Sequence, residues 1–259
     1  MSIDAYGDAE LAALYDLEHD AYDDDLPLYE GFAARGTLPS LELAAGSGRV
    51  ALHLARGGHH VVALDASTAM LARLEARADA DAARHVRVVQ GDMRSFDLGE
   101  RFDLVFIALN SFEHLLTTED AEATLGCIAR HLSPGGVFVT ELRSLASVDW
   151  APGPGATRLE WALPEPESGD LVTKTVTTRP AQTTQTTSHT VVYDRVPAGG
   201  GSVRRRVVQV ELRVFGLHEF RLLLERAGLR LLHAYGGADL SPLTDASDTM
   251  VVVAGPAGG

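Results

Sequence analysis

The stretch from Leu41 to Ala51 limits what this chain can fold into more than any other part of its sequence. Its apolar start predicts a strand, Gly46-Ser47-Gly48 predicts a tight turn, and residues 47–57 predict a helix. Glycines let the backbone approach a ligand closely, and the start of a helix directs free N–H groups at that ligand. We therefore predict a nucleotide-type binding loop.

An acidic residue follows this loop at an informative distance. The apolar run of residues 61–64 ends in Asp65, about 20 residues beyond the glycines, where a carboxylate can accept both hydroxyl groups of a ribose. The ligand is therefore expected to be an adenosine compound. Because Gly46-x-Gly48-x-x-Ala51 also satisfies the dinucleotide fingerprint, NAD is an alternative to S-adenosylmethionine.

Three features favour S-adenosylmethionine over NAD. They are Glu42 inside the first strand, a second acidic position in Gly91-Asp92-Met93, and a helical segment before the first strand. The motifs that follow one another along residues 42–141 are Glu42-Leu-Ala-Ala-Gly-Ser-Gly-Arg, Ala63-Leu-Asp-Ala-Ser, Gln90-Gly-Asp-Met, Phe102-Asp-Leu-Val-Phe-Ile-Ala-Leu-Asn-Ser and Leu132-Ser-Pro-Gly-Gly.

On these motifs the chain resembles the class I S-adenosylmethionine-dependent methyltransferases. The order of its flanking parts is similar to the subgroup that contains glycine/sarcosine and amino-sugar N-methyltransferases. Ala44 departs from the family pattern, which usually has its first glycine at this position. Because alanine is small, we expect a slightly altered turn and a retained site.

Strand and helix signals alternate after residue 38, which predicts an α/β fold with a doubly wound, Rossmann-like sheet. The predicted strands are 40–45, 60–65, 86–90, 102–108, 136–142, 229–235 and 249–254, and the predicted helices are 47–57, 67–82, 118–132 and 217–227. The resemblance implies seven strands whose last two form an antiparallel hairpin. Ser133-Pro134-Gly135-Gly136 is the predicted turn before the fifth strand.

A different pattern occupies residues 146–213, where threonine and valine alternate with other residues as in antiparallel strands. We therefore predict a β insertion after the fifth strand that serves as a substrate-binding lid. The cofactor-binding domain then comprises residues 1–145 and 214–259, with 1–36 as an N-terminal helical cap.

Ligands of such sheets bind beyond the carboxyl ends of the strands, which gathers the predicted site residues in one cleft. The cofactor residues that we expect are Tyr22, Glu42, Ala44, Gly46, Gly48, Asp65, Ala66, Met70, Asp92, Met93, Leu109 and Asn110. Asp92 would accept from the adenine amino group while Met93 packs on the ring. The resemblance implies that an N-terminal helix closes over the cofactor and contributes a tyrosine, for which we choose Tyr22.

Methyl transfer mainly requires positioning, but an amine acceptor must also lose a proton. At an amine pKa near 10.4, only about one molecule in 10³ is neutral at pH 7. His114 is the best-placed candidate base, with Glu113 behind it. The candidate substrate-binding residues are Tyr15, Glu141, Arg143, His189 and Tyr193. No His, Cys and Asp cluster has metal-ligand spacing, so no metal is expected.

Charge and hydropathy narrow the choice of partners. The chain has 22 basic and 36 acidic residues, a net charge of −14, which disfavours a nucleic-acid partner and favours a neutral or cationic acceptor. No apolar run is long enough for a membrane span, and the N-terminus lacks signal-peptide character, so we expect a cytoplasmic protein with no membrane partner. A homodimer is compatible with the sequence.

We therefore expect N-methylation of a small-molecule amine in secondary metabolism, such as antibiotic biosynthesis. The acceptor would be an amino sugar, an amino acid or a peptide N-terminus. A nucleotide sugar would need a basic patch for its phosphates, such as Arg143 or an inward-facing Arg204–Arg206. The alternatives are O-methylation of a hydroxylated natural product, a non-catalytic cofactor-binding protein, and an NAD-dependent oxidoreductase. For the last, the sequence lacks a Tyr-x-x-x-Lys pair, since Lys174 is its only lysine.

Overall fold

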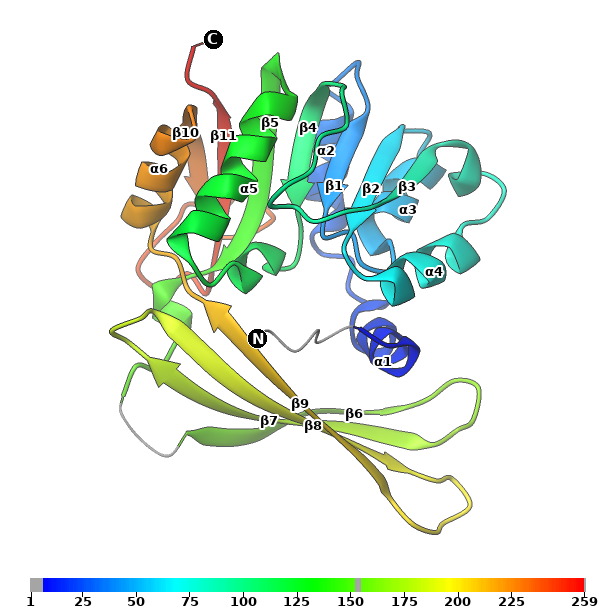
Figure 1. Cartoon of the computed structure of the whole chain (residues 1–259). Coiled ribbons are helices and arrows are strands. Elements are labelled where there is room, and N and C mark those ends of the chain that lie inside the picture. Colours follow the sequence, from blue (N-terminus) through cyan, green and yellow to red (C-terminus); the bar gives the residue numbers. More distant parts are fainter. Residues whose placement is uncertain (1–6, 152–154, 259) are drawn as a thin grey trace.

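The computed structural model describes residues 7–151 and 155–258, which form a seven-stranded sheet and a separate four-stranded sheet (Figure 1). Residues 1–6 of the predicted cap and 152–154 of the predicted insertion lie outside the described residues. The larger sheet has the order β10-β11-β5-β4-β1-β2-β3. Its strands are β1 (Ser40–Leu43), β2 (Val61–Asp65), β3 (Val86–Gln90), β4 (Phe102–Ile107), β5 (Leu132–Arg143), β10 (Leu229–Tyr235) and β11 (Thr249–Pro256).

Strand direction confirms the predicted fold class. β1 to β5 pair in parallel, while β11 is antiparallel to both β5 and β10. The inner parallel strands β1, β2 and β4 are almost fully buried because helices cover both sides of the sheet, which explains their nearly continuous apolar sequences, whereas the edge strand β3 is partly exposed. The carboxyl ends of β1, β2, β4 and β5 consequently share one edge, and the loops that follow them can form a site there.

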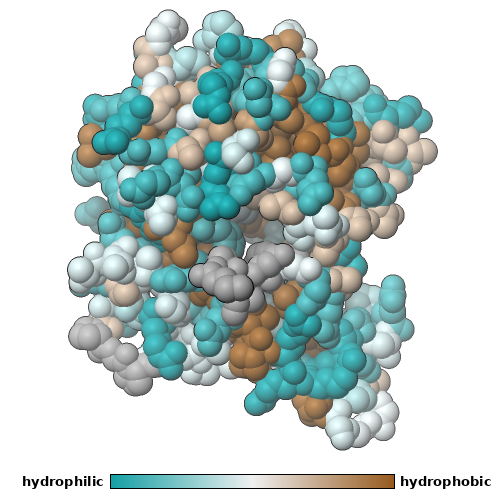
Figure 2. Space-filling model, viewed as in Figure 1, coloured by the Kyte–Doolittle hydropathy of each residue, from teal (hydrophilic) through white to brown (hydrophobic). Residues whose placement is uncertain are grey.

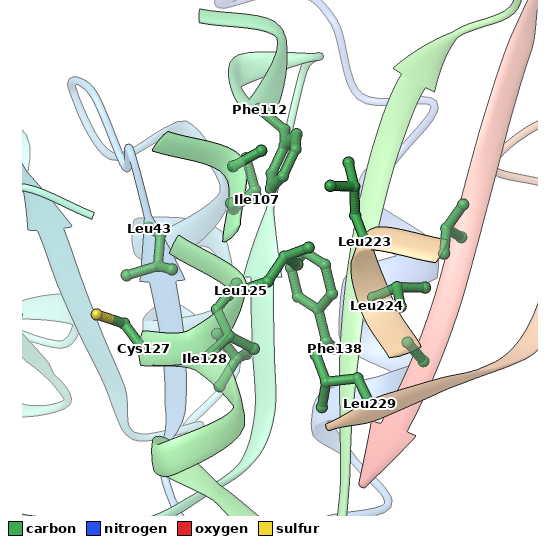
Figure 3. Packing of buried hydrophobic residues seen from close by; sticks show 14 of the residues in the cluster. Leu43, Ile107, Phe112, Leu125, Cys127, Ile128, Phe138, Leu223, Leu224 and Leu229 are labelled. Carbon is green, nitrogen blue, oxygen red and sulfur yellow. The ribbon is translucent and has the colours of Figure 1, made fainter. Parts of the chain in front are cut away.

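The described residues form six α-helices: α1 (Ala9–His19), α2 (Leu26–Ala33), α3 (Arg49–Arg56), α4 (Thr68–Arg77), α5 (Thr118–His131) and α6 (Leu217–Arg226). On one face of the large sheet, α5 and α6 bury apolar residues against β4, β5 and β11. Figure 3 shows Leu125 and Ile128 of α5 near Phe138, with Leu223 and Leu224 of α6 on its other side. The other face is covered by α2 and α3.

The structure moves several of the predicted boundaries. Helix α4 ends at Arg77, not 82, because Asp79 accepts hydrogen bonds from the backbone N–H groups of Asp81 and Ala82 and starts a separate 3₁₀ turn at 82–84. Helix α3 begins at Arg49, after the left-handed Gly48. Strand β5 begins at Leu132, although residues 133–136 bulge out between the pairs Phe102–Leu132 and Leu104–Val137.

The four-stranded sheet is the predicted β insertion, and each of its strands pairs antiparallel with the next. It contains β6 (Ala156–Pro164), β7 (Leu171–Ala181), β8 (Thr186–Val196) and β9 (Arg204–Arg213). Figure 1 shows it across the lower end of the large sheet, with α1 between them. Leu11 and Leu14 of α1 pack on Val172, Val176, Val191 and Val208, so α1 joins the two sheets.

Figure 2 shows a surface on which hydrophilic residues predominate, with hydrophobic areas at the upper right and in the lower central part of the view. Among the described residues, no helix is long and apolar enough to cross a membrane.

Gly48 provides a test of the packing between α3 and α4. A Cβ atom at Gly48 would lie 2.5 Å from the Cγ of buried Leu74, at a φ of +84°. Gly58 has nearly the same φ, +85°, but open space around it. We expect Gly48→Ala to lower the free energy of unfolding by about 1–3 kcal/mol more than Gly58→Ala, measured by denaturant unfolding. Equal losses would show that only the backbone conformation matters.

Candidate functional site

A cleft of about 600 Å³ lies between the two sheets. One wall comes from the carboxyl ends of the parallel strands and their loops, and the other comes from β7, β8 and β9. Tyr15 of α1 contributes a third side. Of the predicted cofactor residues, the cleft is lined by Ala44, Gly46, Asp65, Ala66, Met70, Asp92 and Met93.

The carboxylate of Asp65 holds the loops after β1 and β2 together. Its Oδ2 accepts from the backbone N–H of Gly46 at 2.8 Å, and its Oδ1 accepts from that of Ser67 at 2.8 Å. Asp65 also lines the cleft. Asp65 therefore shapes the glycine loop in addition to facing the ligand space.

Glycine is required at the two positions of the loop for different physical reasons. Gly46 has a φ of +56°, and an added Cβ would meet only the Tyr15 ring, at 3.9 Å, so this position borders the open cleft. Gly48 does not line the cleft, and its missing side chain makes room for Leu74 instead. Close packing of α3 against α4 therefore accounts for the glycine at position 48, where the sequence had suggested close approach of a ligand.

Ala44 also has a left-handed backbone, with a φ of +54°. An alanine pays about 1 kcal/mol in this region, whereas glycine does not. This conformation favours glycine, and the structure forms the turn with alanine.

Asp92 follows β3 and binds an arginine that the sequence analysis did not single out. The Arg94 Nε and Nη2 groups donate to Asp92 at 2.9 and 2.6 Å, and Arg94 Nη1 donates to Asp120 at 3.1 Å. These bonds hold the pKa of Asp92 below its ordinary value. Met70 and Met93 line the same part of the cleft.

Three predicted residues have buried polar atoms without a hydrogen-bond partner among the described residues: Glu42 Oε2, Asn110 Oδ1 and Glu141 Oε2. Burial raises the pKa of Glu42 well above its ordinary value. Burial and, after it, the charge of Asp25 raise the pKa of Glu141 to about 7. Leu109 and Asn110 have left-handed backbones in the turn after β4, and neither they nor Glu42 and Glu141 line the cleft.

Tyr22 does not line the cleft either, whereas Tyr15 does. The guanidinium of Arg49 lies over the Tyr22 ring, with its Cζ atom 5.2 Å from the ring centroid. The backbone carbonyl of Tyr22 also accepts a hydrogen bond from Arg49 Nη1 at 2.8 Å. Arg49 also forms a buried, two-bond ion pair with Asp25 at 2.7 and 2.6 Å. The tyrosine that faces the ligand space is therefore Tyr15, which we had assigned to the substrate.

His114 lines the cleft in the turn after β4. Its side chain is exposed to the cleft, while the surrounding protein and, next, the charge of Arg143 lower its pKa below the ordinary 6.5. The imidazole is consequently neutral at pH 7 and can accept a proton.

Glu113, by contrast, points away from the cleft and is fully buried. Its Oε1 accepts from the backbone N–H of Arg143 and its Oε2 from Arg143 Nε, both at 2.6 Å. The Arg143 Nη2 group then donates to Thr187 of β8 at 3.1 Å. This geometry does not support the expected roles of Glu113 as a base or of Arg143 as a substrate contact, because the two groups satisfy each other and join the sheets.

His189 lines the cleft from β8, but both of its ring nitrogens have protein partners. Nδ1 is 3.0 Å from Thr178 Oγ1 and Nε2 is 2.8 Å from Thr187 Oγ1. Burial, followed by the charge of Arg143, lowers its pKa to about 4. Tyr193 packs near Trp161 in the cluster beneath α1 and does not line the cleft.

The sequence analysis missed most of the wall that the second sheet supplies. The cleft residues on this wall, apart from His189, are Arg179, Ser188, Thr190, Gln209, Val210 and Glu211. Strand alternation had identified these strands as a sheet, but it does not tell which of their residues meet a distant loop. Leu115 and Leu116, which follow His114, were likewise missed.

The model of a methyltransferase domain matches residues 41–136 of this chain. Over 206 residues the chain is 30% identical to the dTDP-3-amino-3,4,6-trideoxy-alpha-D-glucopyranose N,N-dimethyltransferase of Streptomyces venezuelae, covering 76% of this chain and 77% of that protein. It is 37% identical over 142 residues to the dTDP-3-amino-3,6-dideoxy-alpha-D-glucopyranose N,N-dimethyltransferase of Streptomyces fradiae, covering 51% of this chain and 52% of that protein.

Among solved structures, the CcbJ methyltransferase of Streptomyces caelestis has a TM-score of 0.81 and 26% identity, with 98% of both chains covered. The similarity therefore includes the N-terminal helices and the second sheet as well as the region that carries the motifs.

Asp65 should be the most sensitive of the acids that line the first wall. Asp65→Ala removes the acceptor for two loop N–H groups as well as a ligand contact, so we expect at least about 30-fold weaker binding of S-adenosylhomocysteine. Asp92→Ala should weaken binding less, because Arg94 already occupies that carboxylate. Calorimetric titration measures both, and a larger effect at Asp92 would contradict this order.

Glu141 should make stability depend on pH. Between its ordinary pKa of 4.5 and the raised value of about 7, the folded state binds its proton more readily than the unfolded chain does, so stability falls as pH rises through this range. Above pH 7 the penalty reaches as much as about 3 kcal/mol. Glu141→Gln should therefore raise the melting temperature at pH 8 and have little effect at pH 4.5. Exposed Glu75→Gln is the control, and a similar shift there would refute the explanation.

Proposed function

The chain belongs to the class I S-adenosylmethionine-dependent methyltransferases, and from this membership we propose that it methylates the nitrogen of a small-molecule amine. The relatives are named for N-methylation of amino sugars, which supports an amine acceptor. Membership in this family leaves no support for the NAD-dependent alternative. We further propose that the acceptor belongs to secondary metabolism, as in antibiotic biosynthesis.

The observation that carries the proposal is the single cleft with two chemically different walls. The first wall has the glycine loop, Asp65 and the Asp92 region. The second wall has hydroxyl and amide side chains together with one histidine, one valine and one oppositely charged pair of residues, from β7, β8 and β9. A methyl transfer needs a cofactor and an acceptor in one enclosed space, so that the acceptor atom is held on the line of the breaking bond. We therefore propose that residues 146–213 form the acceptor lid.

The residues present fit S-adenosylmethionine. Gly46 borders the open cleft without a side chain to fill it, and Asp65 and Asp92 bring carboxylates to the same wall. The cofactor would be held by the loop at 44–46, Asp65 and the Asp92–Met93 segment, and when bound it supplies an electrophilic methyl group. The cleft walls exclude water from that group and orient the acceptor.

In this proposal His114 takes the proton that an ammonium acceptor must lose. It lines the cleft, and burial and then the charge of Arg143 lower its pKa, which favours the neutral ring that can accept a proton. His189 bonds within the lid, to Thr178 of β7 and Thr187 of β8, and so helps to hold these neighbouring strands together. Glu113 has an indirect role, because it fixes Arg143 between the sheets.

The first experiment tests the function itself. The protein should bind S-adenosylhomocysteine, and with S-adenosylmethionine it should release S-adenosylhomocysteine when supplied with an amine from a panel of amino sugars, amino acids and peptides. Cofactor binding without turnover across the panel would favour a non-catalytic protein. Turnover only with hydroxyl acceptors would favour O-methylation.

His114→Ala should lower kcat at least tenfold with an accepted amine, while the dissociation constant of S-adenosylhomocysteine stays within a fewfold. For the wild type, the rate should fall as pH drops through the His114 ionisation below pH 6.5, and this limb should disappear in the variant. His218→Ala, on the exposed side of α6, is the matched control. A variant with full activity and an unchanged pH profile would show that positioning alone drives the transfer.

A further inference from the structure

We propose that the acceptor of this chain carries no phosphate: it is an unphosphorylated amine with a neutral, hydroxyl- or amide-bearing body, and not a nucleotide-linked sugar. The inference rests on the proposed function, because it names the acceptor class of the same cleft. A nucleoside diphosphate carries at least two negative charges, and a protein must match them with arginine, lysine or a helix N-terminus.

The charged side chains that line the cleft do not provide this match. They are Asp65, Asp92, Glu211, Arg94 and Arg179, which gives three carboxylates against two guanidinium groups. Arg94 is held by Asp92 and Asp120, on the wall assigned to the cofactor. His114 and His189 add no positive charge at pH 7, since the surroundings lower the pKa of both.

On the acceptor wall, the remaining cation has an acid as its near neighbour. Arg179 pairs in register with Ser188, and Ser188 pairs with Glu211, so the three residues form one row across β7, β8 and β9. Two strand spacings separate Arg179 from Glu211, about 10 Å. The carboxylate of Glu211 therefore opposes any phosphate that approaches Arg179, while it attracts an ammonium group.

The other basic residues that the sequence predicts as phosphate contacts bind protein groups outside the cleft. Arg143 binds Glu113 and Thr187, Arg205 binds Asp194, and Arg206 binds Asp8 and Glu10 of the α1 region. None of them lines the cleft in the described part of the chain. Arg206 thus anchors the start of α1, and Arg205 bonds within the second sheet.

The uncharged part of the acceptor wall indicates what binds in place of a phosphate. Ser188, Thr190 and Gln209 offer hydroxyl and amide groups, and Val210 lies beside them. Such groups both donate and accept hydrogen bonds, so they suit hydroxyl or amide groups of a neutral body. The net charge of −14 adds a long-range attraction for a cationic amine.

Thymidine diphosphate is a direct probe, since it is the part of a nucleotide sugar that carries the phosphates. It should be titrated by calorimetry, at low ionic strength, into this protein saturated with S-adenosylhomocysteine. The Streptomyces venezuelae relative, named for a dTDP-linked sugar, is the positive control. We expect thymidine diphosphate to bind this protein at least 100-fold more weakly than it binds that relative. Comparable dissociation constants for the two proteins would overturn the proposal.

A pair of variants tests the electrostatic reason. Glu211→Lys changes the cleft from one excess negative to one excess positive charge, so we expect it to raise thymidine diphosphate affinity at least tenfold. Glu167→Lys makes the same change in net charge at an exposed turn outside the cleft, and we expect less than a twofold effect. Equal effects, or no gain at Glu211, would refute the role of the cleft charges.

The two levels of inference fail in different ways. Loss of S-adenosylhomocysteine binding, or no turnover with any amine, would count against the proposed function. The diphosphate titration needs no turnover, and it can be repeated on the protein without S-adenosylhomocysteine. Tight diphosphate binding would therefore reject only the acceptor class.

Discussion

The hydrogen bonds from the backbone of Gly46 and Ser67 to the carboxylate of Asp65 fix the centre of this molecule. One side chain at the end of β2 sets the loop after β1 and the start of α4. Since ionised carboxylates form strong hydrogen bonds with backbone N–H groups, the loop has one shape before any ligand arrives. A preorganised loop costs less conformational entropy when the cofactor binds.

Helix α1 links this loop to the second sheet, because it contacts the loop on one side and the sheet on the other. Asp16 is buried and bonds to Ser47 of the loop and to Arg73 and Arg77 of α4. On the opposite side of the helix, Leu11 and Leu14 pack on the four-stranded sheet, and Glu18 meets Lys174 at 2.6 Å. Burying a charge such as that of Asp16 costs free energy unless the charge is paired. The pairing therefore favours one position of α1 between the sheets.

Sequence reasoning located the cleft wall of the large sheet better than the wall of the second sheet, for a physical reason. Gly46, Asp65 and Asp92 are set by local rules: each follows a parallel strand, and all such strand ends share an edge. Tyr22 and Tyr15 were harder to separate, because their periodic spacing does not reveal which ring Arg49 covers. The pairing of Glu113 with Arg143 joins residues 30 positions apart, and no local pattern predicts it.

The sequence by itself determined the α/β class, the order of the elements, the antiparallel insertion and the cofactor loop, because hydrophobic period and turn chemistry are local properties. The tertiary structure alone decided that Gly48 serves packing, that Glu113 is buried against Arg143, and that Glu211 and Arg179 meet the cleft. These outcomes depend on how the second sheet lies across the first. That placement follows from packing and ion pairs between distant segments, which sequence spacing does not encode.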